Sequence, residues 1–166
     1  EKIICTFCLY KLPKTNFHTE KENPLSKIFL GRINIESVAA YYLFKKGGKV
    51  QHLLHQFKYK GNREIGKFIG ELYGHELKKT ESFGSVDTII PVPLHKKKEK
   101  KRGFNQSEYF AKGLSISMKN EINTKTLFRE KMSETQTKKT KFKRWENVNN
   151  IFLIRNSENI KGKHIL

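Results

Sequence analysis

The stretch Ile89–Ala111, IIPVPLHKKKEKKRGFNQSEYFA, decides how the chain is organised. It begins at the end of an apolar run, 86–92, that predicts a buried strand. Lys96–Arg102 follows with six cations and one glutamate, and we expect it to form a cationic loop. After Gly103, apolar residues at helical spacing predict a helix that begins near Asn105. This order favours binding of a polyanion, because the helix start offers free N–H groups and the positive end of its dipole.

The composition is typical of one folded domain with a small appendage. The chain has 166 residues, of which 36% are hydrophobic and 11% aromatic, and this excludes a disordered tail. Its net charge of +18 favours nucleic acid, phosphorylated small molecules or an anionic surface as partner. A lysine-rich proteome is the alternative explanation, but the charge is clustered, which compositional drift does not require.

Neither a membrane span nor a signal peptide is recognisable in the sequence. We therefore expect a cytoplasmic protein with no membrane insertion. The sequence begins with Glu1 rather than methionine and stops at Lys163–Leu166, which looks like the start of a strand. We expect the chain to be part of a longer protein.

The two cysteines, Cys5 and Cys8, form a Cys-x-x-Cys pair. This spacing fits half of a zinc site, a redox pair or two unrelated small core residues. A structural zinc site needs four ligands, and the other two could be cysteines that precede the chain or His18. A thioredoxin-like redox pair follows a strand in a βαβ pattern, whereas a polar stretch with prolines follows this one. We prefer the zinc knuckle.

Two helices are predicted in the middle of the chain, over Lys49–Tyr59 and Arg63–Lys79. Both carry apolar and aromatic residues at helical spacing. We expect these stripes to pack into the core rather than to form a cofactor site. Gly61 lies just after the first helix and is a candidate for its C-terminal cap.

The N-terminal part predicts an appendage that leads into the main domain. Residues 11–34 show little periodicity and predict an extended connection, and Ile35–Phe44 predicts a buried strand. We therefore divide the chain into an N-terminal cysteine-knuckle segment, 1–34, and a main domain, 35–166.

The C-terminal part predicts short strands around a cationic segment. Thr126–Arg144 has little apolar period and predicts a solvated arm, or a helix in part if its few apolar residues share one face. Ile151–Ile154 predicts a short strand, and Lys163–Leu166 begins another. Because strands alternate with helices along the chain, we predict an α/β fold with a mostly parallel sheet that is covered on both faces.

Three motifs can be compared with known families: Pro91–His95 (PVPLH), Arg102–Gln106 (RGFNQ) and Arg144–Val148 (RWENV). Together they resemble the ComF competence family, and the resemblance extends along nearly the whole chain. RGFNQ soon after PVPLH is highly specific, whereas the Cys-x-x-Cys is not. The further matches are the Lys-Tyr-x-Gly at Lys58–Gly61 and, loosely, Arg129 followed by Thr135 and Gln136.

The resemblance implies a type I phosphoribosyltransferase-like fold that binds phosphoribosyl diphosphate (PRPP) with Mg²⁺. It also implies a zinc knuckle at the N-terminus. In open α/β sheets the ligand lies across the carboxyl ends of the strands. Arg102, Gly103 and the helix start at Asn105 would then hold diphosphate oxygens. Asn105 could instead serve only as the N-terminal cap of this helix, and the two roles are compatible. The expected ligand-binding residues are Lys58, Tyr59, His95, Arg102, Gly103, Asn105, Gln106, Arg129, Gln136, Arg144 and Asn147. Zn²⁺ would be held by Cys5 and Cys8 in a site that is incomplete in this chain.

Two features of the family pattern are missing from the sequence. The family carries two cysteine pairs, and this chain has one. The family's PRPP loop, two acidic residues followed by a Thr/Gly-rich turn, is also absent. It would follow His164–Leu166, where the chain stops, so we expect a chain that is truncated before this loop.

Two functions from different classes remain open. The first is a phosphoribosyltransferase-like enzyme or PRPP-binding protein, for which no catalytic residue is assignable in this chain. The second is a non-catalytic module of the same fold that binds single-stranded DNA or competence-machinery proteins, because the resemblance implies a role in DNA uptake during natural transformation. The expected DNA-binding residues are Lys96, Lys97, Lys98, Lys100 and Lys101. Three aromatic residues among the cations could stack on bases, although we expect each in the core: Phe104, Phe142 and Trp145.

Overall fold

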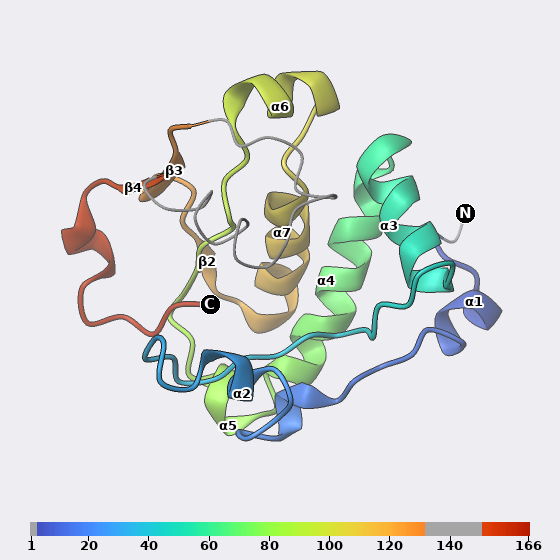
Figure 1. Ribbon diagram of the computed structural model, residues 1–166, viewed down its shortest axis with the longest axis horizontal. Coiled ribbons are helices and arrows are strands. Elements are labelled where there is room, and N and C mark those ends of the chain that lie inside the picture. The colour runs from blue at the N-terminus through green and yellow to red at the C-terminus, as the bar shows by residue number, and fades with distance from the viewer. Residues whose placement is uncertain (1–2, 132–150) are drawn as a thin grey trace.

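Two helices in close contact form the centre of the molecule. The computed structural model describes residues 3–131 and 151–166, and in it α4 (Arg63–Leu77) packs against α7 (Gln106–Met118) (Figure 1). Both helices confirm the predictions from helical spacing. The buried stripe of α4 recurs every fourth residue and consists of Ile65, Ile69, Tyr73 and Leu77.

Glycines allow α4 and α7 to approach more closely than side chains would permit. A Cβ at Gly113 would lie 2.0 Å from the carbonyl oxygen of Lys67, and one at Gly70 would lie 2.2 Å from the carbonyl oxygen of Phe110. Non-bonded atoms do not reach such distances, so only glycine fits at these two positions. Backbone packs directly on backbone, and the position of α7 is fixed relative to α4.

A parallel pair of two-residue strands lies beside α7. β1 (Thr88–Ile89) pairs with β2 (Glu121–Ile122), and β2 contacts α7. Thr88 also forms a parallel bridge with Ile165, and the N–H of Leu166 donates to the carbonyl oxygen of Thr88 at 3.0 Å. Ile165 therefore pairs with β1, in the segment where the sequence predicts the start of a strand.

β1 is shorter than the apolar run 86–92 that predicts it. The chain remains extended after Ile89, but Pro91 and Pro93 have no N–H group to donate to a neighbouring strand. Val86 is 4% exposed, so this part of the run is apolar because it is buried in the core, outside the strand pairing.

The expected strand Ile35–Phe44 is wrong. These residues form a single isolated antiparallel bridge, between Lys14 and Tyr42. The N–H of Leu43 donates to the carbonyl oxygen of Pro13 at 2.8 Å, next to this bridge. The segment is apolar because Tyr41, 8% exposed, packs into the core, and an extended segment that buries side chains resembles a strand in sequence.

β3 (Leu127–Arg129) and β4 (Phe152–Ile154) form a two-stranded antiparallel sheet. β4 confirms the strand expected over Ile151–Ile154. β3 corrects the expectation of an arm or a partial helix at the start of Thr126–Arg144. Its residues alternate between the faces of the sheet, and the guanidinium carbon of Arg155 lies 4.7 Å from the ring centre of Phe128.

Glu76 of α4 holds three side chains from the segment 14–41 against the helical centre. Lys14 forms an ion pair with Oε1 of Glu76, and the hydroxyl of Tyr41 donates to the same oxygen at 3.1 Å. Nε2 of His18 lies 3.6 Å from Oε2. Burial, and next the charge of Glu76, raises the pKa of Tyr41, so its hydroxyl remains a donor.

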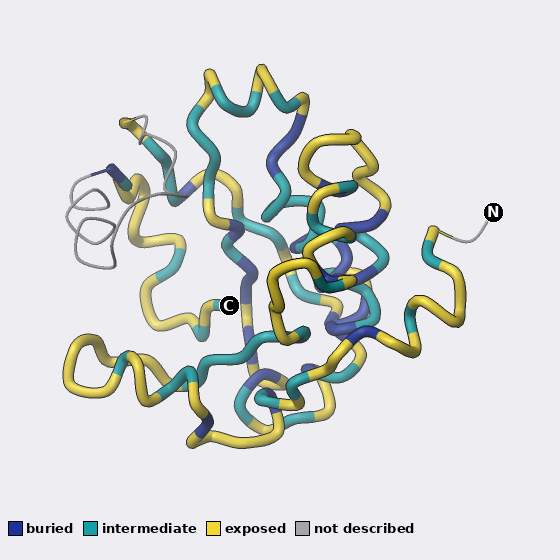
Figure 2. Tube along the Cα trace, turned by 45° about the vertical axis from the view of Figure 1, so that its right-hand side comes forward, coloured by how far each residue is buried: buried dark blue, intermediate teal, exposed yellow. Residues whose placement is uncertain are grey.

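The other helices in the described residues lie around this centre, and all of them except α3 are short. They are α1 (Thr6–Tyr10), α2 (Ser26–Phe29), α3 (Lys49–Tyr59), α5 (Glu81–Gly84), α6 (Lys96–Arg102) and the 3₁₀ helices η1 (Phe17–Thr19) and η3 (Ser157–Ile160). Figure 2 shows the buried residues inside and the exposed ones along the outer turns. Within 3–131 and 151–166, no helix combines the length and apolar character needed to cross a membrane. The architecture is mixed α/β, with short strands in two small sheets.

Replacing Gly113 with alanine should force α4 and α7 apart, because the new methyl group would meet the carbonyl oxygen of Lys67. We expect the free energy of unfolding, measured by urea denaturation, to fall by about 3 kcal/mol. The matched control is His75→Ala at an exposed position of α4, which should change it by less than about 0.5 kcal/mol. Equal, small effects of both substitutions would contradict the close contact.

Candidate functional site

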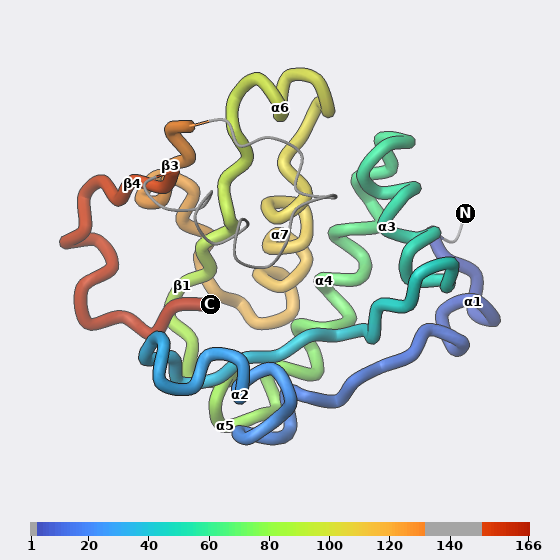
Figure 3. The backbone as a smooth tube through the Cα atoms, viewed as in Figure 1, coloured from blue at the N-terminus to red at the C-terminus, as the bar shows by residue number. Residues whose placement is uncertain are grey.

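The cationic segment Lys96–Arg102 is a helix, α6, and the expected loop is wrong (Figure 3). Two caps explain this. Nδ1 of His95 accepts the N–H of Lys97 at 3.2 Å at the start of the helix. At the end, Gly103 has φ +84°, and its N–H donates to the carbonyl oxygen of Glu99 at 2.7 Å. Seven residues rich in one charge therefore fold as a short helix between two caps.

The helix sorts the cations onto two sides. Successive residues are rotated by about 100°, so Lys96, Lys97, Lys100 and Lys101 share one side, and all four are exposed. Lys98 and Arg102 lie on the other side and are partly buried. Lys98 was expected to bind DNA together with the exposed lysines, and the helical arrangement separates it from them.

Arg102 faces the start of α7 and the end of α3. Its Nη1 donates to Oε1 of Gln106, and its guanidinium carbon lies 5.8 Å from the ring centre of Tyr59. Tyr59 is 66% exposed and follows Lys58, which is also exposed. The structure therefore brings together two sequence motifs, Lys-Tyr-x-Gly and RGFNQ, that lie more than 40 residues apart.

Asn105 fixes the start of α7 to the end of the β1 segment. Its Oδ1 accepts the N–H of Ser107 at 3.2 Å, which caps the helix, and its Nδ2 donates to the carbonyl oxygen of Val92 at 3.1 Å. Asn105 is buried, and so is Phe104, which packs in the core as we expected. A buried amide that bonds to two elements holds them in one geometry.

Arg63, at the first position of α4, was not expected at the site from the sequence. Its Nη2 donates to the carbonyl oxygen of Gly103 at 3.1 Å, and its Nη1 to the hydroxyl of Tyr109 at 3.3 Å. The guanidinium also lies 5.3 Å from the ring centre of Phe104. These partners are about 40 residues away along the chain, so no local pattern in the sequence could reveal them.

The helices α4 and α7 run parallel, and both begin at this place. Arg63 contacts Gly103 and Tyr109 near the start of α7, and further along Ser117 donates to the carbonyl oxygen of Glu71 at 2.6 Å. The positive ends of two helix dipoles therefore lie side by side, with two guanidinium groups beside them. We call Tyr59, Arg63, Arg102, Asn105 and Gln106 the α7-start site. Its arrangement suits an anion with several oxygens.

The remaining residues expected at the ligand site fall elsewhere or outside the described chain. Arg129 is in β3, where its guanidinium carbon lies 5.5 Å from the ring centre of Phe152. Gln136, Arg144 and Asn147 lie outside the described residues, as do Phe142 and Trp145. The N–H of Gly103 donates to the carbonyl oxygen of Glu99 and closes α6, so this N–H is already engaged within the turn.

The Cys-x-x-Cys pair lies at the start of α1. Sγ of Cys5 accepts the N–H of Cys8 at 3.3 Å. This hydrogen bond lowers the pKa of Cys5, and the thiol contact with Cys5 raises the pKa of Cys8. Both cysteines are exposed, and two thiols at one helix start fit half of a zinc knuckle.

His18 does not complete a zinc site with these cysteines. Its imidazole is buried edge-on against Tyr73, with ring centres 5.4 Å apart, and next to Glu76. Across residues 3–131 and 151–166, no three His, Cys, Asp or Glu side chains converge into a group that could hold a metal ion.

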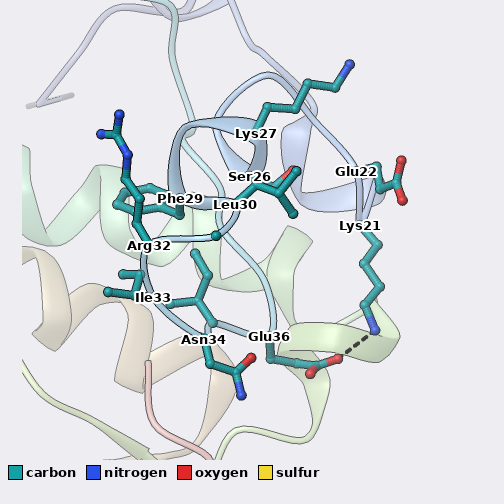
Figure 4. A pocket seen from close by; sticks show the side chains of 12 residues that line it. Lys21, Glu22, Ser26, Lys27, Phe29, Leu30, Arg32, Ile33, Asn34 and Glu36 are labelled. Atoms are coloured by element: carbon teal, nitrogen blue, oxygen red, sulfur yellow. Dashed lines mark hydrogen bonds and ion pairs between the residues drawn. The ribbon is translucent and has the colours of Figure 1, made fainter.

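A cavity of about 880 Å³ lies within the loop 21–36 (Figure 4). An ion pair between Lys21 and Glu36, 2.7 Å apart, borders it. The residues that line it include Phe29 and Leu30, but none of the residues expected to bind ligand. The cavity is therefore not the candidate site.

Comparisons with known proteins found no match. No family model matches the sequence, no curated protein is significantly similar to it, and no solved structure matches the fold. The function must therefore be inferred from the residues and geometry of the chain itself.

Proposed function

We propose that the chain binds PRPP, or a ligand with the same diphosphate group, at the α7-start site, as a ComF-like protein of the phosphoribosyltransferase-like class. The observation that carries this proposal is the convergence of Arg63, Arg102 and the first turn of α7 next to the end of β1. A type I phosphoribosyltransferase-like fold is part of the proposal. The parallel pairing of β1 with β2 and with Ile165 supports it.

The chemistry of the site matches a diphosphate. A guanidinium has five N–H donors, and Arg102 uses one of them on Gln106, so further donors remain for phosphate oxygens. In the first turn of α7, Asn105 accepts the N–H of Ser107, and the neighbouring first-turn N–H groups have no partner within the helix. Tyr59 would cover the ligand from the α3 side. Arg63 would hold Gly103, and with it the turn that leads to α7.

Mg²⁺ would accompany the ligand in this proposal. Glu99 is the one acid within α6, so α6 offers a single carboxylate and no carboxylate cage for the ion. Bound Mg²⁺ supplies charge neutralisation of a departing diphosphate. The residues of this chain bind and orient the diphosphate, and none of them is assigned as nucleophile or base.

Adding Mg²⁺-PRPP at millimolar concentration should raise the melting temperature of the protein, because a ligand that binds the folded state stabilises it. Arg102→Ala should reduce this shift by at least about half, since the variant has no guanidinium to form charge-assisted hydrogen bonds with the diphosphate. The matched control is Arg32→Ala, which removes the same charge from an exposed loop. The proposal is wrong if the wild-type protein shows no shift, or if both substitutions abolish it equally.

A second candidate function is binding of single-stranded DNA by α6. The observation that favours it is the exposed side formed by Lys96, Lys97, Lys100 and Lys101. Cations four residues apart on a helix repel each other, and phosphates placed along this side would relieve the repulsion. Such contacts are independent of sequence, as handling of incoming DNA would require.

Replacing these four lysines with glutamine should weaken binding of an oligothymidylate and flatten its salt dependence. Each lysine that no longer pairs with a phosphate reduces the slope of log affinity against log salt by about 0.7, so we expect a decrease of up to about 3. Fluorescence anisotropy over a series of salt concentrations measures it. The control protein carries Lys27, Lys78, Lys79 and Lys161 as glutamine and has the same net charge. If both proteins change alike, binding depends on net charge and the α6 assignment fails.

A further inference from the structure

An apolar groove lies between α3, α4 and the start of α7. It has a volume of about 360 Å³, and its walls are apolar or aromatic except for Lys58, Gln106 and Ser107. Phe57 of α3 forms part of the wall and is 7% exposed, whereas Phe44 at the edge is 58% exposed. Leu54 and Phe110 are partly exposed in the groove. Figure 1 shows α3 at the periphery, beside α4.

The groove is bordered by positive charge on the side of α3. Residues 37–63, which run from the segment before α3 to the first residue of α4, contain six lysines and arginines and no aspartate or glutamate, whereas the first turns of α4 and α7 carry Glu64 and Glu108. Two exposed lysines, Lys45 and Lys46, directly follow Phe44 in the chain. A third exposed lysine, Lys58, lines the groove itself. An apolar surface with a rim of one charge selects a partner with apolar anchors and the opposite charge.

The aliphatic part of the lining favours a peptide over a nucleic acid. Val50, Leu53, Leu54 and Ile69 contribute aliphatic walls, which pack against aliphatic and aromatic side chains. A nucleic acid gains its affinity from phosphate contacts and flat stacking surfaces. Among the described residues that line the groove, Lys58 is the one that carries a charge.

We propose that this groove docks an acidic segment of a partner protein, which inserts large apolar side chains between α3 and α7 and places its carboxylates against Lys45, Lys46 and Lys58. An amphipathic helix laid into a groove is a common way to satisfy both requirements. This inference is independent of PRPP binding, although Gln106 belongs to the α7-start site and also lines the groove.

The probe is a fluorescein-labelled peptide of about 16 residues, with leucine and phenylalanine at i, i+3, i+4 and i+7 and glutamate on the other face. Fluorescence anisotropy with the full chain should give a dissociation constant in the micromolar range. A peptide of the same composition in scrambled order should bind at least about tenfold more weakly, because it keeps the charge but has no continuous apolar face.

Phe44→Ser should weaken binding of the peptide about tenfold, since Phe44 lines the groove and its exposure lets the fold tolerate the change. Leu54→Ser should act in the same direction. The matched control is Leu43→Ser, because Leu43 is equally exposed at 59% but is not part of the lining; its effect should stay within about twofold. Melting temperatures of the three variants should remain near that of the wild type.

Four results would overturn the inference. Equal binding of the scrambled peptide would mean that charge alone attracts the probe, and equal effects of Phe44→Ser and Leu43→Ser would place the contact outside the groove. An oligothymidylate whose own affinity falls with Phe44→Ser, and which displaces the peptide, would make nucleic acid the occupant. A wild-type dimer in sedimentation that Phe44→Ser dissociates would make a second copy of the chain the occupant.

Discussion

The backbone contact between α4 and α7 at Gly70 and Gly113 is the constraint on which the rest of the described structure depends. No side chain separates the two helices there, so one cannot slide or tilt without a collision of main-chain atoms. The helices are parallel, and the contact therefore sets their first turns side by side. Arg63, which begins α4, reaches the Gly103 carbonyl oxygen before α7 for this reason. The α7-start site is a consequence of how two glycines pack.

The positive groups of the α7-start site repel one another, and a bound anion would relieve this repulsion. Two positive dipole ends, Arg63 and Arg102 lie together, and α6 adds lysines four residues apart. The protein compensates in part with the first-turn carboxylates Glu64 and Glu108. Aromatic rings also contribute, because Tyr59, Phe104 and Tyr109 each lie within 6 Å of a guanidinium carbon. A polyanion would compensate the rest, and this is the physical basis of the proposed binding of PRPP.

The sequence predicted what depends on local pattern. Helical spacing predicted α3, α4 and α7, and Asn105 was recognised as a candidate cap because asparagine before a helix is a local signal. The sequence failed where long-range contacts decide. The apolar residues of Ile35–Phe44 suggested a strand. Among the described residues, however, this segment forms one isolated β-bridge and no ladder. Lys96–Arg102 suggested a loop because of its charge, while His95 and Gly103 had already defined a helix.

The candidate site was predicted only in part, because local motifs revealed some of its residues and long-range contacts determine the others. Arg102, Asn105 and Gln106 adjoin one another in the sequence, so one motif revealed them together. Arg63 could not be found, because its contacts with Gly103 and Tyr109 exist only once α4 and α7 are packed. The close contact itself was also missed. In the sequence, a glycine within a helix indicates only a lower helix propensity. The structure shows that Gly70 and Gly113 face each other.

A crystal structure of the protein with Mg²⁺ and PRPP tests the central claim most directly. The account predicts diphosphate oxygens within hydrogen-bond distance of the Arg102 guanidinium and of first-turn N–H groups of α7, with Gly103 unchanged at the end of α6. A diphosphate bound elsewhere, or bound only by lysines on the exposed side of α6, would contradict it.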